Sequence, residues 1–337
     1  MNLNTATARH DDGRAIIEKK IRAMGTDVIV AIINDDGAGA RADTKEVARA
    51  IADFEKRFSR FLPASEVCSL NASGGEVCRT SADMAAMLAA AQYWHKDTGG
   101  IFDPSVCEAL EEIGYDKSID FEQGPVREET AHFFDAGAHQ RRFQACPRFA
   151  DVRIDEEAGT VMVPTGMKLD FGGIGKGYSV DMIARSLRKK YSDFWISAGG
   201  DMFLSGRNSE GKPWEVMVQD PLDSGNDIGC IAMGERKEMA VATSGVTKRK
   251  GVKGGFAWHH IIDPRTGLPA ENAIAAVTVI APTVTEADVC AKTVLILGEK
   301  EGIDFIERHA GLACCAVTKN GAIIYSQEMK KYFTPVS

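Results

Sequence analysis

Residues 169–181 read "LDFGGIGKGYSVD" and place four glycines and one lysine between an apolar run and a predicted helix over residues 179–191. Successive glycines let a backbone approach a ligand closely, and a helix N-terminus offers unpaired N–H groups to an anion. The segment therefore predicts a glycine turn that holds a phosphate, with Lys176 as a mobile positive charge. An ordinary strand-to-helix turn, in which Asp170 caps the helix and Lys176 is solvated, explains the same residues. Other segments must decide between the two.

Neither standard phosphate motif matches this turn. A Walker A loop needs Ser or Thr after its lysine, whereas Gly177 follows Lys176, and Asp170 stands where the first glycine belongs. The dinucleotide fingerprint fails because Gly173, Gly175 and Gly177 follow a G-x-G-x-G spacing. A phosphate at this turn would therefore be held in another way.

The composition predicts a soluble globular protein that does not bind nucleic acid. The 337 residues are 44% hydrophobic and 26% charged with a net charge of -8, so local donors must hold any anionic ligand. No apolar run approaches the roughly 18 residues of a membrane helix. Because the N-terminus lacks the apolar core of a secretory signal, we expect a cytoplasmic protein without a transmembrane segment.

The cysteines and histidines give no sign of a metal site. Eight cysteines show no CxxC pair and no zinc-ligand spacing, which predicts reduced thiols. Cys290, Cys314 and Cys315 lie in apolar stretches and are expected to be buried. The adjacent His259 and His260 are interpreted as one buried and one exposed strand residue rather than a ligand pair.

The order of elements predicts an α+β fold with mixed or antiparallel sheets and packed helices, because strands come in runs. A strand is expected within residues 15–34, running into a turn at "NDDGAG", and "EEAGT" predicts a hairpin turn. Ser81 is expected to cap a helix. Residues 1–14 are predicted to be disordered, residues 119–149 have no clear periodicity, and residues 15–337 are predicted to form one domain of two intimately associated halves. Helices are expected over residues 44–61, 81–98, 179–191, 285–298 and 299–309.

Several stretches together, in order and spacing, resemble the FAD:protein FMN transferases, or ApbE family. The resemblance spans roughly residues 20 to 330 and implies the ApbE-like, T-fold-related form of the α+β fold. It rests on "MGT" at 24–26, "FSRFLPASEVCSLN" at 58–71, "GGIFDPSV" at 99–106, the glycine turn, "SAGGD" at 197–201, "ATSG" at 242–245, "HIIDPRTGLP" at 260–269 and "VTVIAPTVTEADVCAKTVLILG" at 277–298.

The resemblance implies a magnesium-dependent reaction on FAD. FAD would be the substrate: its pyrophosphate is cleaved, FMN passes to a Thr or Ser hydroxyl of an acceptor protein, and AMP is released. Phosphoryl transfer asks for charge neutralisation and positioning, which a cation, a lysine and backbone donors provide.

The resemblance also implies which residues act. Asp288, Lys176 and His260 would be catalytic. Phe61 falls where the family often has a tyrosine, which keeps a stacking face but loses the hydroxyl. The FAD-binding positions would be Met24, Phe61, Ile101, Phe102, Asp103, Lys176, Tyr178, His260, Ile261 and Asp263.

The implied magnesium site matches only in part. Its ligands would be the Gly175 carbonyl, Asp288 and a Thr or Ser one helical turn later, where this chain has Lys292. A protonated amine has no lone pair for a metal. Lys292 is expected to point away and leave the ion to Asp288, Gly175, waters and phosphates. Alternatively the charge of Lys292 replaces part of the metal's role. A third interpretation is that Asp288 and Lys292 form an ordinary surface pair. Asp288 also follows Thr285 by three residues, which is close to a capping-box arrangement.

Three functions remain open from the sequence. The leading hypothesis is the FMN transferase, with FAD and an acceptor protein bearing Thr or Ser as partners. The others are an FAD pyrophosphatase, which gives free FMN and AMP, and a non-catalytic FAD-binding or storage protein. A Ser-His-Asp hydrolase is disfavoured because no G-x-S-x-G elbow occurs.

Overall fold

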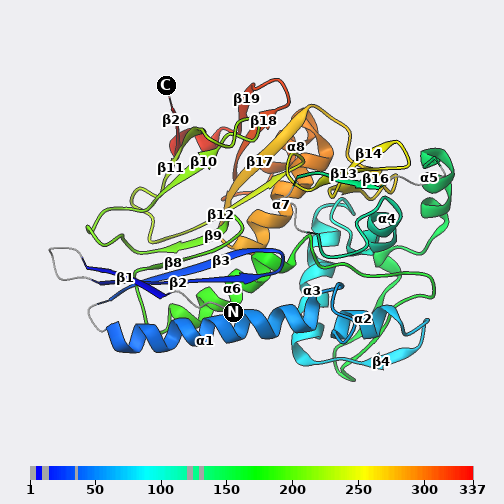
Figure 1. The fold of residues 1–337 in the computed structure, drawn as a ribbon, viewed down its shortest axis with the longest axis horizontal. Coiled ribbons are helices and arrows are strands. Elements are labelled where there is room, and N and C mark those ends of the chain that lie inside the picture. Colours follow the sequence, from blue (N-terminus) through cyan, green and yellow to red (C-terminus); the bar gives the residue numbers. More distant parts are fainter. Residues whose placement is uncertain (1–4, 10–14, 35–36, 120–123, 129–132, 337) are drawn as a thin grey trace.

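One large sheet forms the frame of the molecule (Figure 1). The computed structural model describes residues 5–9, 15–34, 37–119, 124–128 and 133–336. Within them the large sheet has nine strands, and every neighbouring pair is antiparallel. In spatial order the strands are β1 (Thr5–Arg9), β2 (Ala15–Ala23), β3 (Thr26–Asn34), β8 (Phe194–Ala198), β9 (Asp201–Ser205), β12 (Glu238–Gly245), β17 (Ile274–Ala281), β18 (Ala313–Thr318) and β19 (Ile323–Tyr325).

Residues 15–34 form a hairpin of two strands, where the sequence predicts one strand. β2 and β3 pair from Ala15↔Asn34 to Ala23↔Thr26 around a turn at Met24 and Gly25, both with positive φ. Residues 5–9, predicted to be disordered, pair with β2 as β1. That part of the prediction is wrong, because the exposed edge of β2 offers hydrogen-bond partners to any nearby extended segment. Residues 1–4 and 10–14 lie outside the described residues.

The longer helices agree with the sequence within a few residues at most ends. Ser81 caps α3 as predicted, its hydroxyl accepting from the Met84 N–H at 3.1 Å. α6 begins at Gly175, inside the glycine turn rather than after it. The cap of α7 is Thr283 and not Thr285. The helices are α1 (Gly37–Phe58), α2 (Glu66–Asn71), α3 (Ala82–Asp97), α4 (Cys107–Glu112), α5 (Ala136–Ala145), α6 (Gly175–Leu187), α7 (Val284–Leu297) and α8 (Glu299–Glu307).

The smaller sheets lie around this frame. The predicted hairpin at "EEAGT" is confirmed as β6 and β7. Residues 119–149 contain α5, whose only buried residues are His139 and Phe143, too few to give a periodic signal. Beyond η1 (Pro104–Val106), η3 (Phe149–Asp151) and η4 (Glu328–Lys331), the remaining elements are β4 (Val77–Arg79), β5 (Val126–Glu128), β6 (Arg153–Asp155), β7 (Thr160–Met162), β10 (Glu215–Gln219), β11 (Asp227–Ala232), β13 (Lys250–Lys253), β14 (Phe256–His259), β15 (Ile262–Asp263), β16 (Leu268–Pro269) and β20 (Phe333–Pro335).

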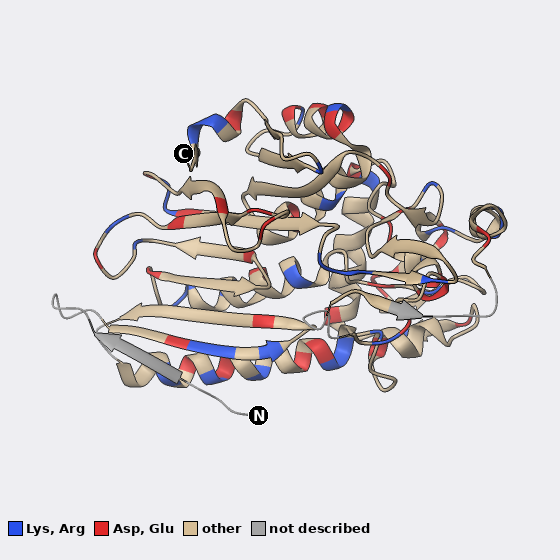
Figure 2. Ribbon diagram, turned by 45° about the horizontal axis from the view of Figure 1, so that its top comes forward, with Lys and Arg blue, Asp and Glu red and all other residues tan. Residues whose placement is uncertain are grey.

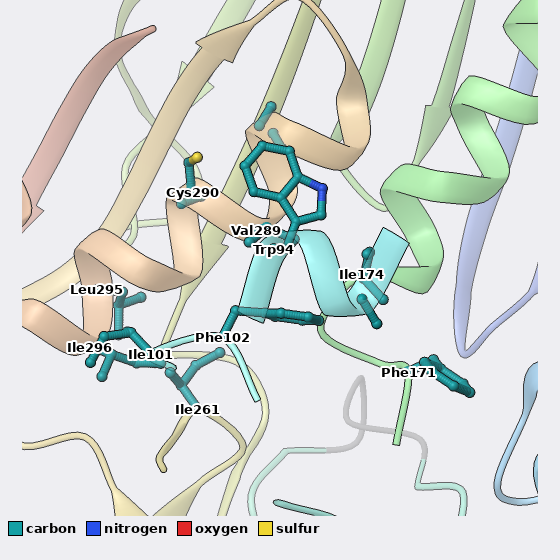
Figure 3. Packing of buried hydrophobic residues seen from close by; sticks show 14 of the residues in the cluster. Trp94, Ile101, Phe102, Phe171, Ile174, Ile261, Val289, Cys290, Leu295 and Ile296 are labelled. Atoms are coloured by element: carbon teal, nitrogen blue, oxygen red, sulfur yellow. The ribbon is translucent and has the colours of Figure 1, made fainter. Parts of the chain in front are cut away.

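The largest core cluster joins the sheet to the helices around α7. Its members come from α1, α3, α7 and the strands β12, β17 and β18. Figure 3 shows buried side chains from α3, from residues 101–102 and from residues 171–174 gathering beside α7. The cluster thus holds two segments of the resemblance, residues 99–106 and the glycine turn, against α7, which belongs to a third.

The cysteines match the sequence expectation, and α1 carries both signs of charge. Basic and acidic segments alternate along α1 in Figure 2. No helix within the described ranges combines the length and apolar character that crossing a membrane requires. The eight cysteines are free thiols, and Cys290, Cys314 and Cys315 are buried as predicted.

Candidate functional site

A cavity of about 270 Å³ opens where α1, the 101–103 segment, the glycine turn and α7 meet. This is close to the lower end of the size range for small-molecule sites. Tyr178, Asp263 and Asp288 do not line it, although the resemblance implies them. The implied residues that do line it are Met24, Phe61, Ile101, Phe102, Asp103, Gly175, Lys176, His260, Ile261 and Lys292.

The glycine turn brings α6 against the start of α7. A Cβ on Gly177 would lie 2.6 Å from the Val284 carbonyl oxygen and 2.9 Å from the Thr285 Cα, so only glycine allows this approach. One turn later Asp181 accepts the N–H groups of Val284 at 2.9 Å and Thr285 at 2.8 Å. The side chains of Lys176 on α6 and Asp288 on α7 are thereby held on facing helices.

Two lysines of the cavity wall and two aspartates that pair with them are defined here as the charged end of the cavity: Lys176, Lys292, Asp201 and Asp288. The Lys176 ammonium contacts Asp201 Oδ2 and lies 3.7 Å from Asp288 Oδ1, the oxygen that the Lys292 ammonium also contacts. Both carboxylate side chains are 0% exposed, whereas those of Lys176 and Lys292 are 17% and 13% exposed. Lys176 is therefore not solvated, and Asp288 and Lys292 are not a surface pair.

Lys292 does not point away from the site, so that expectation is wrong. A fully buried carboxylate requires a compensating charge and hydrogen bonds. Lys292 follows Asp288 by four residues on α7, which places it on the same face and within reach. The Gly177 N–H donates to the other oxygen, Asp288 Oδ2, at 3.3 Å. The four-residue spacing predicts that Asp288 and Lys292 are neighbours, but it does not show that they are buried.

Burial shapes the pKa values at the charged end. It lowers the pKa of Lys176 to about 7, and the nearby cations Lys292 and Arg249 act in the same direction while Asp288 opposes them. Burial alone would raise the pKa of Asp288, but Lys176 and Lys292 outweigh it and keep that pKa below its ordinary value. Asp288 is thus held as a carboxylate between two cations.

The donor set does not fit a magnesium ion. The described residues contain no group of three His, Cys, Asp or Glu side chains placed to hold a metal. Both oxygens of Asp288 already accept from the chain. Asp201 Oδ1 is a buried carboxylate oxygen without a hydrogen-bond partner. Magnesium is commonly bound by one or two carboxylates with waters and phosphates. The one carboxylate oxygen left here belongs to Asp201, whose other oxygen contacts the Lys176 ammonium, so a like charge would lie close to the ion.

Arg60 and two aromatic rings form the aromatic end of the cavity, defined here as Arg60, Phe61 and Tyr115. The guanidinium carbon lies 4.2 Å from the centroid of the Phe61 ring and 5.1 Å from that of Tyr115. Arg60 Nε donates to Asp170 Oδ2 at 2.6 Å, and Nη2 donates to the Tyr115 carbonyl at 2.5 Å. Phe61 therefore offers a ring to the cavity, as the resemblance implies.

The adjacent histidines are both half-buried, so the expectation of one buried and one exposed residue is wrong. His259 Nε2 lies 3.0 Å from the Ala270 carbonyl, and burial lowers the pKa of His259 to about 4. His260 lines the cavity, and its Nδ1 is buried without a hydrogen-bond partner. Burial, helped by Arg249 and His259, holds the pKa of His260 well below its ordinary value. His260 is therefore a neutral imidazole at the cavity wall.

Two implied residues serve the scaffold instead of the cavity. The Tyr178 ring stacks on Phe54, with centroids 6.3 Å apart. Asp263 pairs with Arg265, whose Nε donates to Asp263 Oδ1 at 2.9 Å. The sequence reasoning missed Arg60 and Asp201. Arg60 lies in "FSRFLPASEVCSLN" and Asp201 in "SAGGD", and both stretches belong to the resemblance. The charge of each residue within a matched stretch is the signal that could have identified it.

Comparison with known proteins decides the family. A model of the ApbE family matches residues 24–316. The chain belongs to the ApbE family. This confirms the resemblance drawn from the motifs.

Relatives of known name or structure match nearly the whole chain. A Haemophilus influenzae protein named FAD:protein FMN transferase is 26% identical over 329 residues, which cover 95% of this chain and 92% of that protein. A Treponema pallidum protein of the same name is 26% identical over 316 residues, 89% of this chain and 84% of that one.

Solved structures confirm the α+β, ApbE-like fold. The ApbE protein of Thermotoga maritima superposes with a TM-score of 0.81 at 27% identity, covering 94% of this chain and 99% of that one. The flavin transferase ApbE from Vibrio cholerae gives a TM-score of 0.78 at 21% identity, covering 98% of this chain and all 100% of that one.

Proposed function

We propose that this chain transfers FMN from FAD to a threonine or serine hydroxyl of an acceptor protein and releases AMP. The observation that carries the proposal is one cavity with a ring-stacking end and an ammonium end in a member of the ApbE family. A flavin dinucleotide has the matching chemistry, ring systems joined by a diphosphate. Family relatives named FAD:protein FMN transferase support the same reaction.

In the proposed step the acceptor hydroxyl oxygen attacks the phosphorus of the FMN half. The bond from that phosphorus to the bridging oxygen breaks, and AMP leaves with the bridging oxygen and its electron pair. Lys176 and Lys292 line the cavity and neutralise the charge that develops on the phosphate oxygens. The hydroxyl proton passes to the neutral imidazole of His260, which lines the cavity.

Asp288 acts as a positioning residue in this proposal, because it lies behind the lysines and does not line the cavity. The Gly177 N–H and the Lys292 ammonium hold its two oxygens, and it in turn orients the lysines. Magnesium is implied by the resemblance, but the donor set around Asp288 does not fit it. No step is therefore assigned to a metal.

The test is a reaction of the chain with FAD and a candidate acceptor protein carrying exposed threonine and serine. The proposal expects AMP in solution and an equal amount of flavin bound covalently to the acceptor, measured by chromatography and by in-gel flavin fluorescence. Free FMN with AMP would instead identify the pyrophosphatase. Intact FAD after hours with a proven acceptor would identify a binding or storage protein and contradict transfer.

A further inference from the structure

We propose that Lys176 and Lys292 bind the FAD diphosphate in place of a divalent metal ion, so that FAD binding by this chain does not need magnesium. The inference rests on the proposed function in taking FAD as the ligand. It goes beyond that function because it assigns the charge compensation to two side chains of this chain.

The position of the two ammonium groups carries the inference. Both contact or approach one oxygen, Asp288 Oδ1, from opposite helices, and both side chains line the cavity. A divalent ion on Asp288 would have to displace Lys292 and then lie beside Lys176. Like charges this close in a buried site repel strongly. The place for a cation on Asp288 is thus already taken by the chain.

The hydrogen-bonding capacity of the lysines points the same way. An ammonium has three N–H donors. Lys176 contacts Asp201 and Lys292 contacts Asp288, so each carboxylate fixes one ammonium while further donors can meet phosphate oxygens. A lysine is an established phosphate-binding point charge. The two carboxylates therefore orient the lysines toward a ligand.

The charge balance of this wall suits an anion. Arg249 also lines the cavity and gives Lys176 and Lys292 a third cationic neighbour. With both lysines protonated, these three cations stand against Asp201 and Asp288 and leave one net positive charge. A diphosphate diester brings two negative charges into this surplus. Asp201 Oδ1, the carboxylate oxygen without a hydrogen-bond partner, is the remaining place for a metal contact, and the experiment tests it.

The experiment measures metal binding and FAD binding separately on the full chain. Protein freed of metal by a chelator and desalted is titrated with Mn²⁺, which is followed by electron paramagnetic resonance. FAD affinity is measured by flavin fluorescence with chelator and again with Mg²⁺. We expect no specific Mn²⁺ site and FAD dissociation constants that agree within about twofold. A single Mn²⁺ site at micromolar affinity, or FAD binding at least about tenfold weaker in chelator, would overturn the inference.

Two substitutions sharpen the result. Lys292→Met removes the charge and keeps the length, and we expect a loss of FAD affinity of about tenfold or more that Mg²⁺ does not restore. Lys292→Thr frees Asp288 Oδ1 and adds a hydroxyl oxygen, so this variant should gain a Mn²⁺ site. Lys300→Met is the matched control, because Lys300 is an 88% exposed lysine on α8. Unchanged FAD affinity in a folded Lys292→Met protein would contradict the role of Lys292.

Circular dichroism and a second variant distinguish a loss of folding from a loss of FAD affinity. Lys292→Met leaves Asp288 buried without that partner, whereas the double variant Lys292→Met/Asp288→Asn removes both charges. If the single variant does not fold, the double variant still tests the loss of FAD affinity. Failure of the inference also differs from failure of the proposed function. FAD binding in chelator without transfer overturns only the transfer, and transfer that requires Mg²⁺ overturns only the inference.

Discussion

The aromatic end and the charged end of the cavity both pair buried cations with carboxylates, yet they differ in what the cation can still do. Arg60 Nε donates to Asp170 and Nη2 to the Tyr115 carbonyl, and the guanidinium carbon lies 4.2 Å and 5.1 Å from the centroids of the Phe61 and Tyr115 rings. Lys176 and Lys292 each contact a carboxylate through one small ammonium group. A planar guanidinium with committed donors stabilises the wall, whereas an ammonium with spare donors can bind a ligand.

The largest expected effect separates stability from activity at the aromatic end. Arg60→Ala breaks a buried pair and leaves Asp170 without that partner, which should lower the free energy of unfolding by about 3–5 kcal/mol. Urea unfolding measures it. The double variant Arg60→Met/Asp170→Asn should recover most of the loss, because it leaves no unpaired charge. A loss below about 1 kcal/mol for Arg60→Ala would show that this end does not stabilise the fold.

The charged end should affect the reaction itself. Lys176→Met should lower the rate of AMP release from FAD by about 10²- to 10³-fold, since it removes a cation from the developing phosphate charge. Because Lys176→Met also leaves the fully buried Asp201 without that partner, folding is checked by circular dichroism, and the double variant Lys176→Met/Asp201→Asn should show the same loss of rate. The control is Lys300→Met, which should keep the full rate. A rate of AMP release within a factor of a few of the unmodified chain would remove Lys176 from the reaction.

A third prediction concerns His259, which lies behind the cavity wall and titrates, unlike Arg60. Burial lowers the pKa of His259 from its ordinary 6.5 to about 4, so the folded protein favours the neutral ring. Its contribution to stability is complete above pH 6.5 and is lost as pH falls from 6.5 to about 4, by up to about 3 kcal/mol.

The measurement is the free energy of unfolding against pH for the unmodified chain and for His259→Gln. The variant should show a shallower decline over this interval, because one fewer proton is bound on unfolding. If the free energy of unfolding declined with the same slope in both proteins, His259 would have the same pKa in the folded and the unfolded state.

The smallest expected effect lies with ring stacking at the aromatic end. Phe61→Leu keeps an apolar side chain but loses the aromatic face, and stacking of this kind contributes about 0.5–1.5 kcal/mol. FAD affinity should therefore fall by roughly two- to tenfold while stability stays nearly constant. Fluorescence titration measures the affinity, with Phe133→Leu as the matched control, because Phe133 is 91% exposed and does not line the cavity. Equal FAD affinity in Phe61→Leu would exclude Phe61 from the ligand.

The sequence predicted the parts of the fold that depend on local pattern. Ser81 and the apolar stripe after it gave α3, and runs of strands gave the antiparallel sheet. β1 and α5 were missed because β1 depends on pairing with β2 and α5 buries only two residues. Local periodicity carries no information on either.

The site was predicted as a set of motifs but not as a set of contacts. The sequence identifies Lys176 and Lys292 as site positions. The prediction that Lys292 points away from the site was wrong, because a four-residue spacing does not reveal that a pair is buried. Arg60 and Asp170 lie 110 residues apart, so their pairing appears only once the chain is folded. The difference between the two ends of the cavity is therefore a property of tertiary structure.

The most direct test of this account is a crystal structure of the full chain grown with both FAD and magnesium. We expect diphosphate oxygens at roughly 3 Å from the ammonium groups of Lys176 and Lys292, with no metal on Asp288. One ring of the ligand should lie against Phe61. A magnesium ion bridging Asp288 and the diphosphate, or FAD bound away from the two lysines, would contradict it.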